Sequence, residues 1–63
     1  MNKMLFTRST HEWVHVAVDE VAGKIWLTMA NGVTFRGYTL PYTETLIDEI
    51  ELECAMRGFL KNG

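Results

Sequence analysis

The sequence of 63 residues contains one cysteine, one proline and no long apolar run. The single cysteine, Cys54, excludes an intrachain disulfide, which favours a reducing compartment, and Cys54 itself is expected to be a small buried apolar residue. The apolar run at residues 4–6 is far too short for the core of a signal peptide, and no stretch approaches the ~20 apolar residues of a membrane-spanning helix. We therefore expect a cytoplasmic protein without a membrane partner.

Basic residues are also scarce, with six Lys and Arg against eight Asp and Glu and a formal net charge of −2. The charge is uneven, because residues 1–41 carry +1 and residues 42–63 carry −3. Neither part has the stripe of Lys and Arg that non-specific nucleic-acid affinity requires. Composition alone therefore argues against nucleic acid as a partner.

A chain of 63 residues is expected to form one small domain over residues 1–63, and it buries only about 60% of its unfolded surface. Hydrophobic residues make up 48% of this chain. So small a body cannot place all of that apolar surface inside. We expect part of it to face a partner protein or a second copy of the chain.

The part before Pro41 is predicted to be mainly β structure, over residues 1–41. Residues 13–18 and 24–29 are rich in β-branched and aromatic side chains, and residues 33–39 follow Asn31-Gly32, a pair typical of a type I′ hairpin. Residues 3–8 could add an edge strand. This hairpin would pair Ala30 with Val33 and place one set of side chains on a common face: Trp26, Thr28, Val33 and Phe35, joined by Val14 and Val16, with Val18 as a further candidate. The opposite face would carry Trp13, His15, Ala17, Ile25, Leu27, Met29, Arg36 and Tyr38.

The part after Pro41 is predicted to be a helix over residues 42–63. Thr43 is suited to cap it, acidic residues crowd its first turns and basic residues lie near its end, as the helix dipole favours. Apolar residues form two stripes on different sides of this helix: Leu46, Ile47, Ile50 and Cys54, and then Leu52, Met56, Phe59 and Leu60. The fold class expected is thus α+β, a small antiparallel sheet of two to three strands packed against a C-terminal helix. In the alternative interpretation, Gly58 ends or bends the helix and both stripes serve one core.

Residues His11-Glu12-Trp13-Val14-His15 match the H-E-x-x-H pattern of zinc metalloproteases. That pattern binds zinc only on a helix, where residues i and i+4 share a face. Along a strand the two histidines would lie about 13 Å apart, too far to share one ion. Residues 13–18 favour a strand by propensity, although Ser9 and Glu12 could form a capping box that starts a helix. No third histidine exists, so a carboxylate such as Glu49 or Glu53 would have to be the third ligand. We expect no metal site, no catalytic residues and no cofactor.

The remaining chemistry favours binding rather than catalysis. The residues expected to contact a partner protein are aromatic residues and a methionine: Trp13, Tyr38, Met56 and Phe59. The second helical stripe is expected to form a homodimer interface, made of Leu52, Met56, Phe59 and Leu60. The alternative is a nucleic-acid platform on the outer face of the sheet, made of Trp13, His15, Arg36 and Tyr38.

Taken as a whole, from "MNKMLFTRSTHEWVHVAVDE" to "CAMRGFLKNG", the chain resembles the small proteins encoded in the early exo-xis region of lambdoid bacteriophages. The resemblance implies a phage protein made early in the bacterial cytoplasm, acting on the balance between lysis and lysogeny or on takeover of the host. The apolar surface expected on both faces of the sheet and the two helical stripes favour a non-enzymatic regulatory protein, and together with the resemblance we expect it to bind a host or phage protein. The resemblance supplies no catalytic or binding residues.

Overall fold

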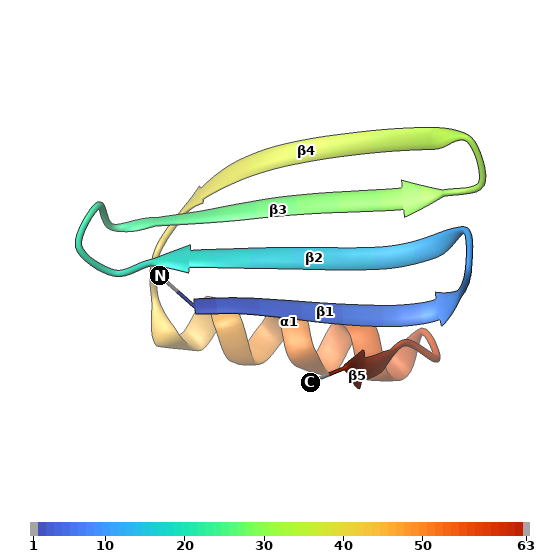
Figure 1. Cartoon of the computed structure of the whole chain (residues 1–63). Helices are drawn as coiled ribbons and strands as arrows, with labels where there is room; N and C mark the ends of the chain where they lie inside the picture. Colours follow the sequence, from blue (N-terminus) through green and yellow to red (C-terminus); the bar gives the residue numbers. More distant parts are fainter. Residues whose placement is uncertain (1, 63) are drawn as a thin grey trace.

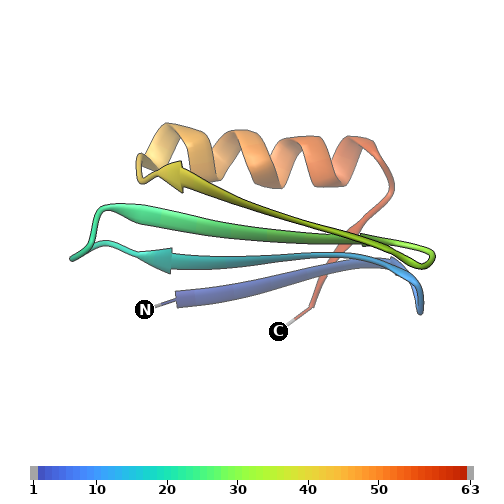
Figure 2. The ribbon, with the colours of Figure 1, turned by 90° about the horizontal axis from the view of Figure 1, so that it is seen from above.

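The computed structural model describes residues 2–62 and contains one sheet and one helix (Figure 1). The elements follow one another along the chain as β1 (Asn2–Ser9), β2 (Glu12–Asp19), β3 (Lys24–Asn31), β4 (Thr34–Pro41), α1 (Glu44–Met56) and β5 (Leu60–Asn62). All strand pairs are antiparallel, and the order across the sheet is β4-β3-β2-β1-β5. Helix α1 lies against one face of this sheet and leaves the other face uncovered (Figure 2). The α+β class is confirmed, but the sheet has five strands among the described residues rather than two or three.

The helix predicted to continue to residue 63 ends at Met56, so that prediction is wrong for the last residues. Gly58 has φ +83, a left-handed conformation that glycine adopts without steric cost. The N–H of Phe59 donates to the carbonyl of Cys54 at 2.9 Å, and the N–H of Gly58 donates to that of Ala55 at 3.1 Å. These two bonds form a Schellman motif, which satisfies the last carbonyls of the helix. The alternative is therefore confirmed where it ends the helix at Gly58, and the chain reverses to add β5 beside β1. Its second part, one core for both stripes, is wrong, because Leu52, Met56 and Leu60 remain exposed.

The hairpin between β3 and β4 uses Gly32 and Val33 as its turn, one residue later than the predicted Asn31-Gly32. Asn31 pairs with Thr34, so Ala30 lies opposite Phe35 instead of Val33. Gly32 has φ +66, and no described residue other than glycine has a positive φ. Only one turn residue therefore needs a positive φ, as in a type II′ turn with glycine first. This leaves the Val33 side chain in solvent.

The face predicted for β2 is also wrong. Residues 20–23 connect β2 to β3, and Asp19 pairs with Lys24. This register places Val16 opposite Leu27, so the β2 valines lie on the helix side of the sheet, together with Ile25, Leu27 and Met29. Trp13, His15 and Ala17 lie on the other side, with Trp26 and Thr28. Because strand side chains alternate, an error of one residue in pairing moves every side chain of a strand to the opposite face.

The core lies between α1 and the face of the sheet that it covers. Its buried residues are Phe6, Val14, Val16, Val18, Ile25 and Cys54, and they are packed by partly buried residues that include Leu46, Ile47 and Ile50 of the helix. The first predicted helical stripe therefore packs on the sheet, as expected. The side chain of Thr43 accepts a hydrogen bond from the N–H of Leu46 at 3.0 Å, which confirms Thr43 as the N-cap. The helix is thus fixed at both ends over one face of the sheet.

Candidate functional site

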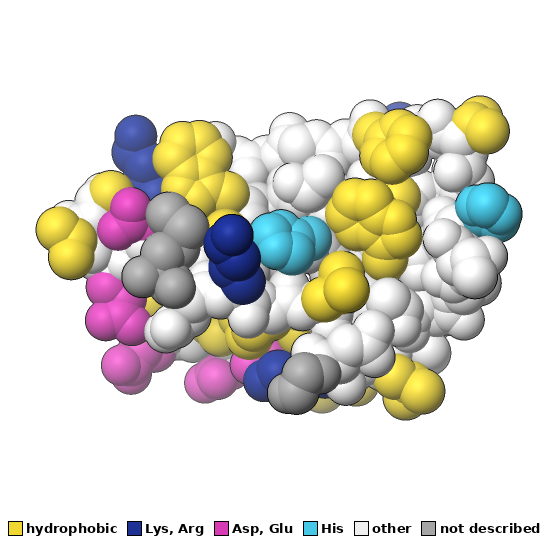
Figure 3. All heavy atoms as spheres, viewed as in Figure 1, with side chains coloured by type: hydrophobic (Ala, Val, Ile, Leu, Met, Phe, Trp, Pro, Cys, Tyr) yellow, Lys and Arg dark blue, Asp and Glu magenta, His cyan; other side chains and the backbone are white. Residues whose placement is uncertain are grey.

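The uncovered side of the sheet, which we call the open face, carries the largest group of exposed apolar side chains on one surface. It consists of alternate residues from all five strands, and its large apolar members are Leu5, Trp13, Trp26, Phe35 and Leu60. Phe35 is 66% exposed and Leu60 is 72% exposed. Figure 3 shows apolar side chains on this face with histidine and basic side chains between them. Exposed apolar surface gathered on one side of a small domain is typical of an interaction site.

One end of the open face is formed by an aromatic pair across three strands. Trp13 of β2 and Phe35 of β4 both pair with Ala30 of β3, which lies between them. Their ring centroids are 6.1 Å apart with the planes tilted by 56°, a favourable geometry for aromatic pairs. The methyl group of Ala30 leaves room for both rings to lean toward each other, and they bury it to 5% exposure. The result is a broad aromatic surface at the end of the sheet near the β3–β4 turn.

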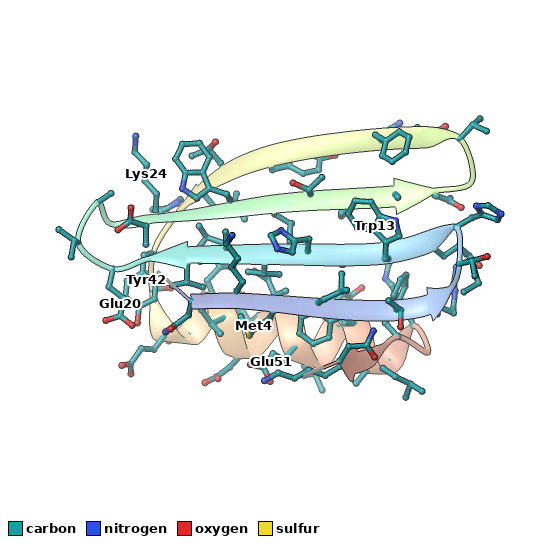
Figure 4. The ribbon with its side chains drawn as sticks, viewed as in Figure 1. Met4, Trp13, Glu20, Lys24, Tyr42 and Glu51 are labelled. Atoms are coloured by element: carbon teal, nitrogen blue, oxygen red, sulfur yellow. The ribbon has the colours of Figure 1, made fainter. Side chains whose placement is uncertain are left out.

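The other end of the open face combines Trp26 with positive charge. The ammonium group of Lys24 lies 5.5 Å from the centroid of the Trp26 ring, a distance that allows a cation–π interaction. Lys3 and Trp26 flank Ala17 in the same way that Trp13 and Phe35 flank Ala30. Figure 4 shows Trp13 and Lys24 at opposite ends of this side of the sheet. The charged side chains within this face are therefore lysines, with Asp19 at its border.

Acidic side chains gather on the other side of the molecule. The helix carries five carboxylates, on Glu44, Asp48, Glu49, Glu51 and Glu53. Two of them are paired, because Glu53 accepts from Arg57 at 2.7 Å and Glu51 lies 3.8 Å from Lys61. The two layers thus differ in charge, with a weakly positive open face and a negative helix. This polarity favours partners whose apolar surface is bordered by carboxylates.

A concave region lies between α1 and the helix side of β3 and β4. It is a groove of about 750 Å³ with an apolar floor that includes Leu27, Met29, Ile50 and Cys54. Arg8 closes one end of it. Its guanidinium lies 4.8 Å from the centroid of the Phe59 ring, donates to the carbonyl of Arg57 at 2.9 Å and forms an ion pair with Glu12. Hydrogen bonds from Arg8 and Ser9 hold the pKa of the Glu12 carboxyl below its usual value. The polar groups at that end therefore form hydrogen bonds and an ion pair with one another.

The four residues predicted to bind a partner are not brought together by the structure. Trp13 lies on the open face, whereas Tyr38 lies on the helix side of β4 because it pairs with Leu27. Met56 projects from the helix and is 74% exposed, and Phe59 packs against the core in the turn that follows. Only Trp13 belongs to the candidate site. The nucleic-acid platform is divided in the same way, because Arg36 and Tyr38 lie on the side opposite to Trp13 and His15.

The four residues predicted for a dimer interface are also separated. Leu52 and Met56 remain exposed on the helix, but Leu60 belongs to β5 and lies on the open face. The prediction of a single stripe is wrong because the helix stops before Phe59. Sequence reasoning missed Leu5, Trp26 and Phe35 as site residues, and it named Leu60 only for a dimer interface. The predicted β3–β4 hairpin correctly placed Trp26 on one face with Phe35. The wrong face predicted for β2, however, separated Trp26 and Phe35 from Trp13.

The H-E-x-x-H match lies mostly in a strand. His11 is in the turn before β2, and residues 12–15 are the first four of that strand, which confirms the strand predicted over residues 13–18. An extended chain holds His11 and His15 about 13 Å apart. Within residues 2–62, no three side chains of His, Cys, Asp or Glu gather as metal ligands. In the same range, no helix is long and apolar enough to cross a membrane.

Cys54 supports a prediction about pH. Burial raises the pKa of its thiol, and the neighbouring Glu53 adds to this effect. The unfolded chain therefore loses this proton at a lower pH than the folded chain does. The thiol contributes its full stabilising effect below the unfolded pKa of about 8.5, and that contribution is lost as pH rises through the folded pKa. Urea unfolding from pH 7 to 10 should show a steeper loss of stability for the natural chain than for Cys54→Ala.

The comparison between these two chains is needed because Tyr42 also titrates in the alkaline range. Desolvation raises the pKa of Tyr42, and the charges of Glu20 and Glu44 raise it further. Figure 4 shows Tyr42 close to Glu20 at one end of the sheet. Tyr42 is present in both chains, so its effect cancels in the difference. Equal pH dependence of stability in the two chains would contradict the assignment of the extra alkaline loss of stability to Cys54.

No family model matches the chain, and no curated protein and no solved structure was found to match it.

Proposed function

We propose that this protein is a non-enzymatic binding module that recognises another protein through its open face. The observation that carries the proposal is the exposure of Leu5, Trp26, Phe35 and Leu60 on one uncovered side of the sheet, next to the half-buried Trp13. These side chains present on the order of 400 Å² of apolar surface, which is as large as the main patch of a typical monomer. For a chain of only 63 residues this is a large patch. Tryptophan is also the residue that most often dominates binding energy at interfaces.

The charge of the open face indicates the chemistry of the partner. Lys3 and Lys24 border the aromatic side chains, and the acidic helix lies on the far side of the sheet. A partner with an apolar patch bordered by Asp or Glu would pair with these lysines at the rim, where charge mainly affects the rate of association and the choice of partner. In line with the resemblance to early phage proteins, we propose a host or phage protein in the bacterial cytoplasm as that partner.

The test compares two surfaces of the same molecule. Four chains are each immobilised and exposed to bacterial lysate. They are the natural chain, Trp26→Ala, Phe35→Ala and the double variant Leu52→Ser/Met56→Ser. A retained protein is then identified and purified, and its Kd is measured against all four chains. We expect each open-face variant to weaken binding by roughly ten- to thirtyfold, which corresponds to a hot spot of about 1.4–2 kcal/mol.

The helix variant is the matched control, because Leu52 is 62% exposed and Met56 is 74% exposed on the layer opposite to the open face. Binding that is lost with the helix variant and retained with the open-face variants would overturn the proposed surface. Circular dichroism of every variant ensures that only folded proteins are compared.

A second candidate function is binding of single-stranded nucleic acid by the same face. It is favoured by one observation, the combination of exposed aromatic rings with Lys24 beside Trp26. Bases stack on such rings while lysines contact phosphates. Tryptophan fluorescence titrated with an oligonucleotide at low salt tests it. Binding should weaken in Lys24→Ala and be unchanged in Arg36→Ala, because Arg36 lies on the other side of the sheet. An unchanged fluorescence at tens of micromolar oligonucleotide would remove this candidate.

A further inference from the structure

Strand β4 presents a long free edge. It pairs with β3 over all of its eight residues, from Thr34 opposite Asn31 to Pro41 opposite Lys24, with no irregularity in the register. Within residues 2–62, nothing pairs with its other side. The opposite edge of the sheet is β5, which has only three residues. Figure 1 shows β4 along the upper border of the sheet, away from α1. A strand of this length is able to pair with a further strand.

The hydrogen bonds at the two ends of β4 show which of its backbone N–H and C=O groups point toward β3. The N–H of Tyr42 donates to the carbonyl of Gly23 at 3.0 Å, toward the side of β3. At the other end, Thr34 closes the two-residue turn with Asn31, and such closing residues bond to each other. Backbone direction alternates along a strand, so even-numbered residues face β3. The N–H and C=O groups of Phe35, Gly37 and Thr39 therefore point to the free edge.

This edge has few of the features that usually prevent strand pairing, because it carries only one charged side chain, Arg36, and one proline, at its last position. Natural edge strands are often protected by lysine, proline or a bulge. Residues 34–40 contain no lysine and no proline, and Pro41 comes only at the last position. Gly37 lies in the middle of the strand, where a β-carbon would meet nothing within 4 Å. At its centre the edge therefore carries no side chain that could obstruct a further strand.

We propose that a second copy of this chain pairs with β4 in antiparallel orientation, around a two-fold axis that passes through Gly37. Residues that lie opposite each other must point to the same face of the sheet, so the axis has to pass through a residue. An axis at Arg36 would place two guanidinium groups opposite each other, which is unfavourable. An axis at Tyr38 would place Phe35 opposite Pro41, which has no N–H to donate.

The axis at Gly37 avoids both conflicts and produces complementary pairs. Arg36 lies opposite Tyr38 of the second copy, so that a cation and an aromatic ring meet twice across the interface. Phe35 lies opposite Thr39 of the second copy, on the open face. The outward backbone groups of residues 35, 37 and 39 then form about six hydrogen bonds between the copies. Tyr38 is 44% exposed in the single chain, so it is accessible for this contact.

The small area of this contact indicates that it is weak. Seven paired residues extend about 23 Å at 3.3 Å per residue, and a strand edge about 10 Å thick buries only a few hundred Å² per copy. A standard stable interface buries about 800 Å² per partner. The dimer is therefore weak and depends on protein concentration. Both open faces lie on the same side of the joined sheet, because the axis is perpendicular to it. This inference does not depend on the proposed function, since it rests on the outward backbone groups of β4 and on Arg36 and Tyr38, which lie on the helix side.

Cross-linking tests the position of the axis. Residues opposite each other in a hydrogen-bonded pair have Cα atoms about 5.5 Å apart, which suits a disulfide. Gly37→Cys should therefore form a covalent dimer when oxidised with glutathione disulfide. The matched control is Thr39→Cys, whose two copies would lie about 13 Å apart, beyond the reach of a disulfide. We expect at least about tenfold more dimer for Gly37→Cys, and the natural chain gives the background from the buried Cys54. Equal cross-linking at positions 37 and 39 would overturn the register.

Charge substitution tests the same interface without new covalent bonds. Tyr38→Glu would place a carboxylate opposite Arg36 of the second copy, whereas Tyr38→Arg would place two cations together. Sedimentation equilibrium from about 10 to 500 μM should show that the first variant dimerises at least about tenfold more strongly than the second. A mass of 7.2 kDa at all concentrations for the natural chain, with no cross-link at position 37, would overturn the proposal. A dimer lost in Leu52→Asp and insensitive to both Tyr38 variants would overturn it in favour of the helix.

Discussion

Phe6→Ala is expected to leave most of the chain unfolded at 37 °C. Phe6 is 3% exposed and lies in β1 between Val14 of β2 and Lys61 of β5, on the side that faces the helix. Truncation of a buried phenylalanine costs about 3–5 kcal/mol, from lost burial and from the cavity that remains. A domain of this size has a total stability of only about 3–9 kcal/mol. The loss is therefore comparable to the whole free energy of unfolding.

Circular dichroism against temperature and urea measures this effect. The matched control is Leu5→Ala, one residue earlier in the same strand, where the side chain points to the open face and is 36% exposed. That substitution should cost about 1 kcal/mol and retain the cooperative transition. Similar losses in the two variants would contradict the assignment of the two faces of β1.

Val16→Asp is expected to abolish folding, whereas His15→Asp in the same strand should not. Val16 is fully buried between the sheet and α1, so a carboxylate at this position would lose its hydration without gaining a charged partner. His15 is only partly buried and points to the open face. Aspartate is a poor strand residue, and His15→Asp should therefore cost about 1 kcal/mol.

Unfolding in urea distinguishes these outcomes directly. The pair also tests the corrected face of β2, because the sequence-based prediction placed Val16 with Trp26 and His15 with Ile25. A folded Val16→Asp with an unfolded His15→Asp would support the face of β2 predicted from the sequence and would contradict the open face as described.

Local sequence signals identified much of this fold. Thr43 is recognisable as an N-cap from sequence alone, because its hydroxyl can accept from a backbone N–H in the first turn of the helix. The stripe of Leu46, Ile47 and Ile50 indicates which side of the helix is buried. Strand propensity located β2, β3 and β4 closely. The α+β class could therefore be predicted, because it depends on which segments are strand or helix and not on how they pair.

Pairing was harder to predict because it depends on single residues in the turns. The choice between Asn31-Gly32 and Gly32-Val33 shifts the hairpin by one residue, and both contain the glycine that the turn needs. The loop between Asp19 and Lys24 contains Gly23, with φ +68, but this glycine does not fix the length of the loop, and that length decides which face of β2 is buried. β5 was missed because a three-residue strand has no periodicity to detect. The candidate site depends on these pairings, so the sequence located only Trp13 among its proposed contact residues.

The return of the chain at Gly58 has a consequence for the order of folding. β5 pairs with β1 across almost the whole chain, and Asn62 donates to the hydroxyl of Thr7, 55 residues earlier, at 2.9 Å. β1 to β4 connect through short turns, so their contacts close small loops, whereas β5 must close the longest loop in the molecule. We therefore expect β5 to dock late in folding, after the four-stranded meander and the helix have formed. Contacts that form after the transition state mainly affect the rate of unfolding. The three residues of β5 are therefore expected mainly to slow unfolding, because the rest of the structure forms before they dock.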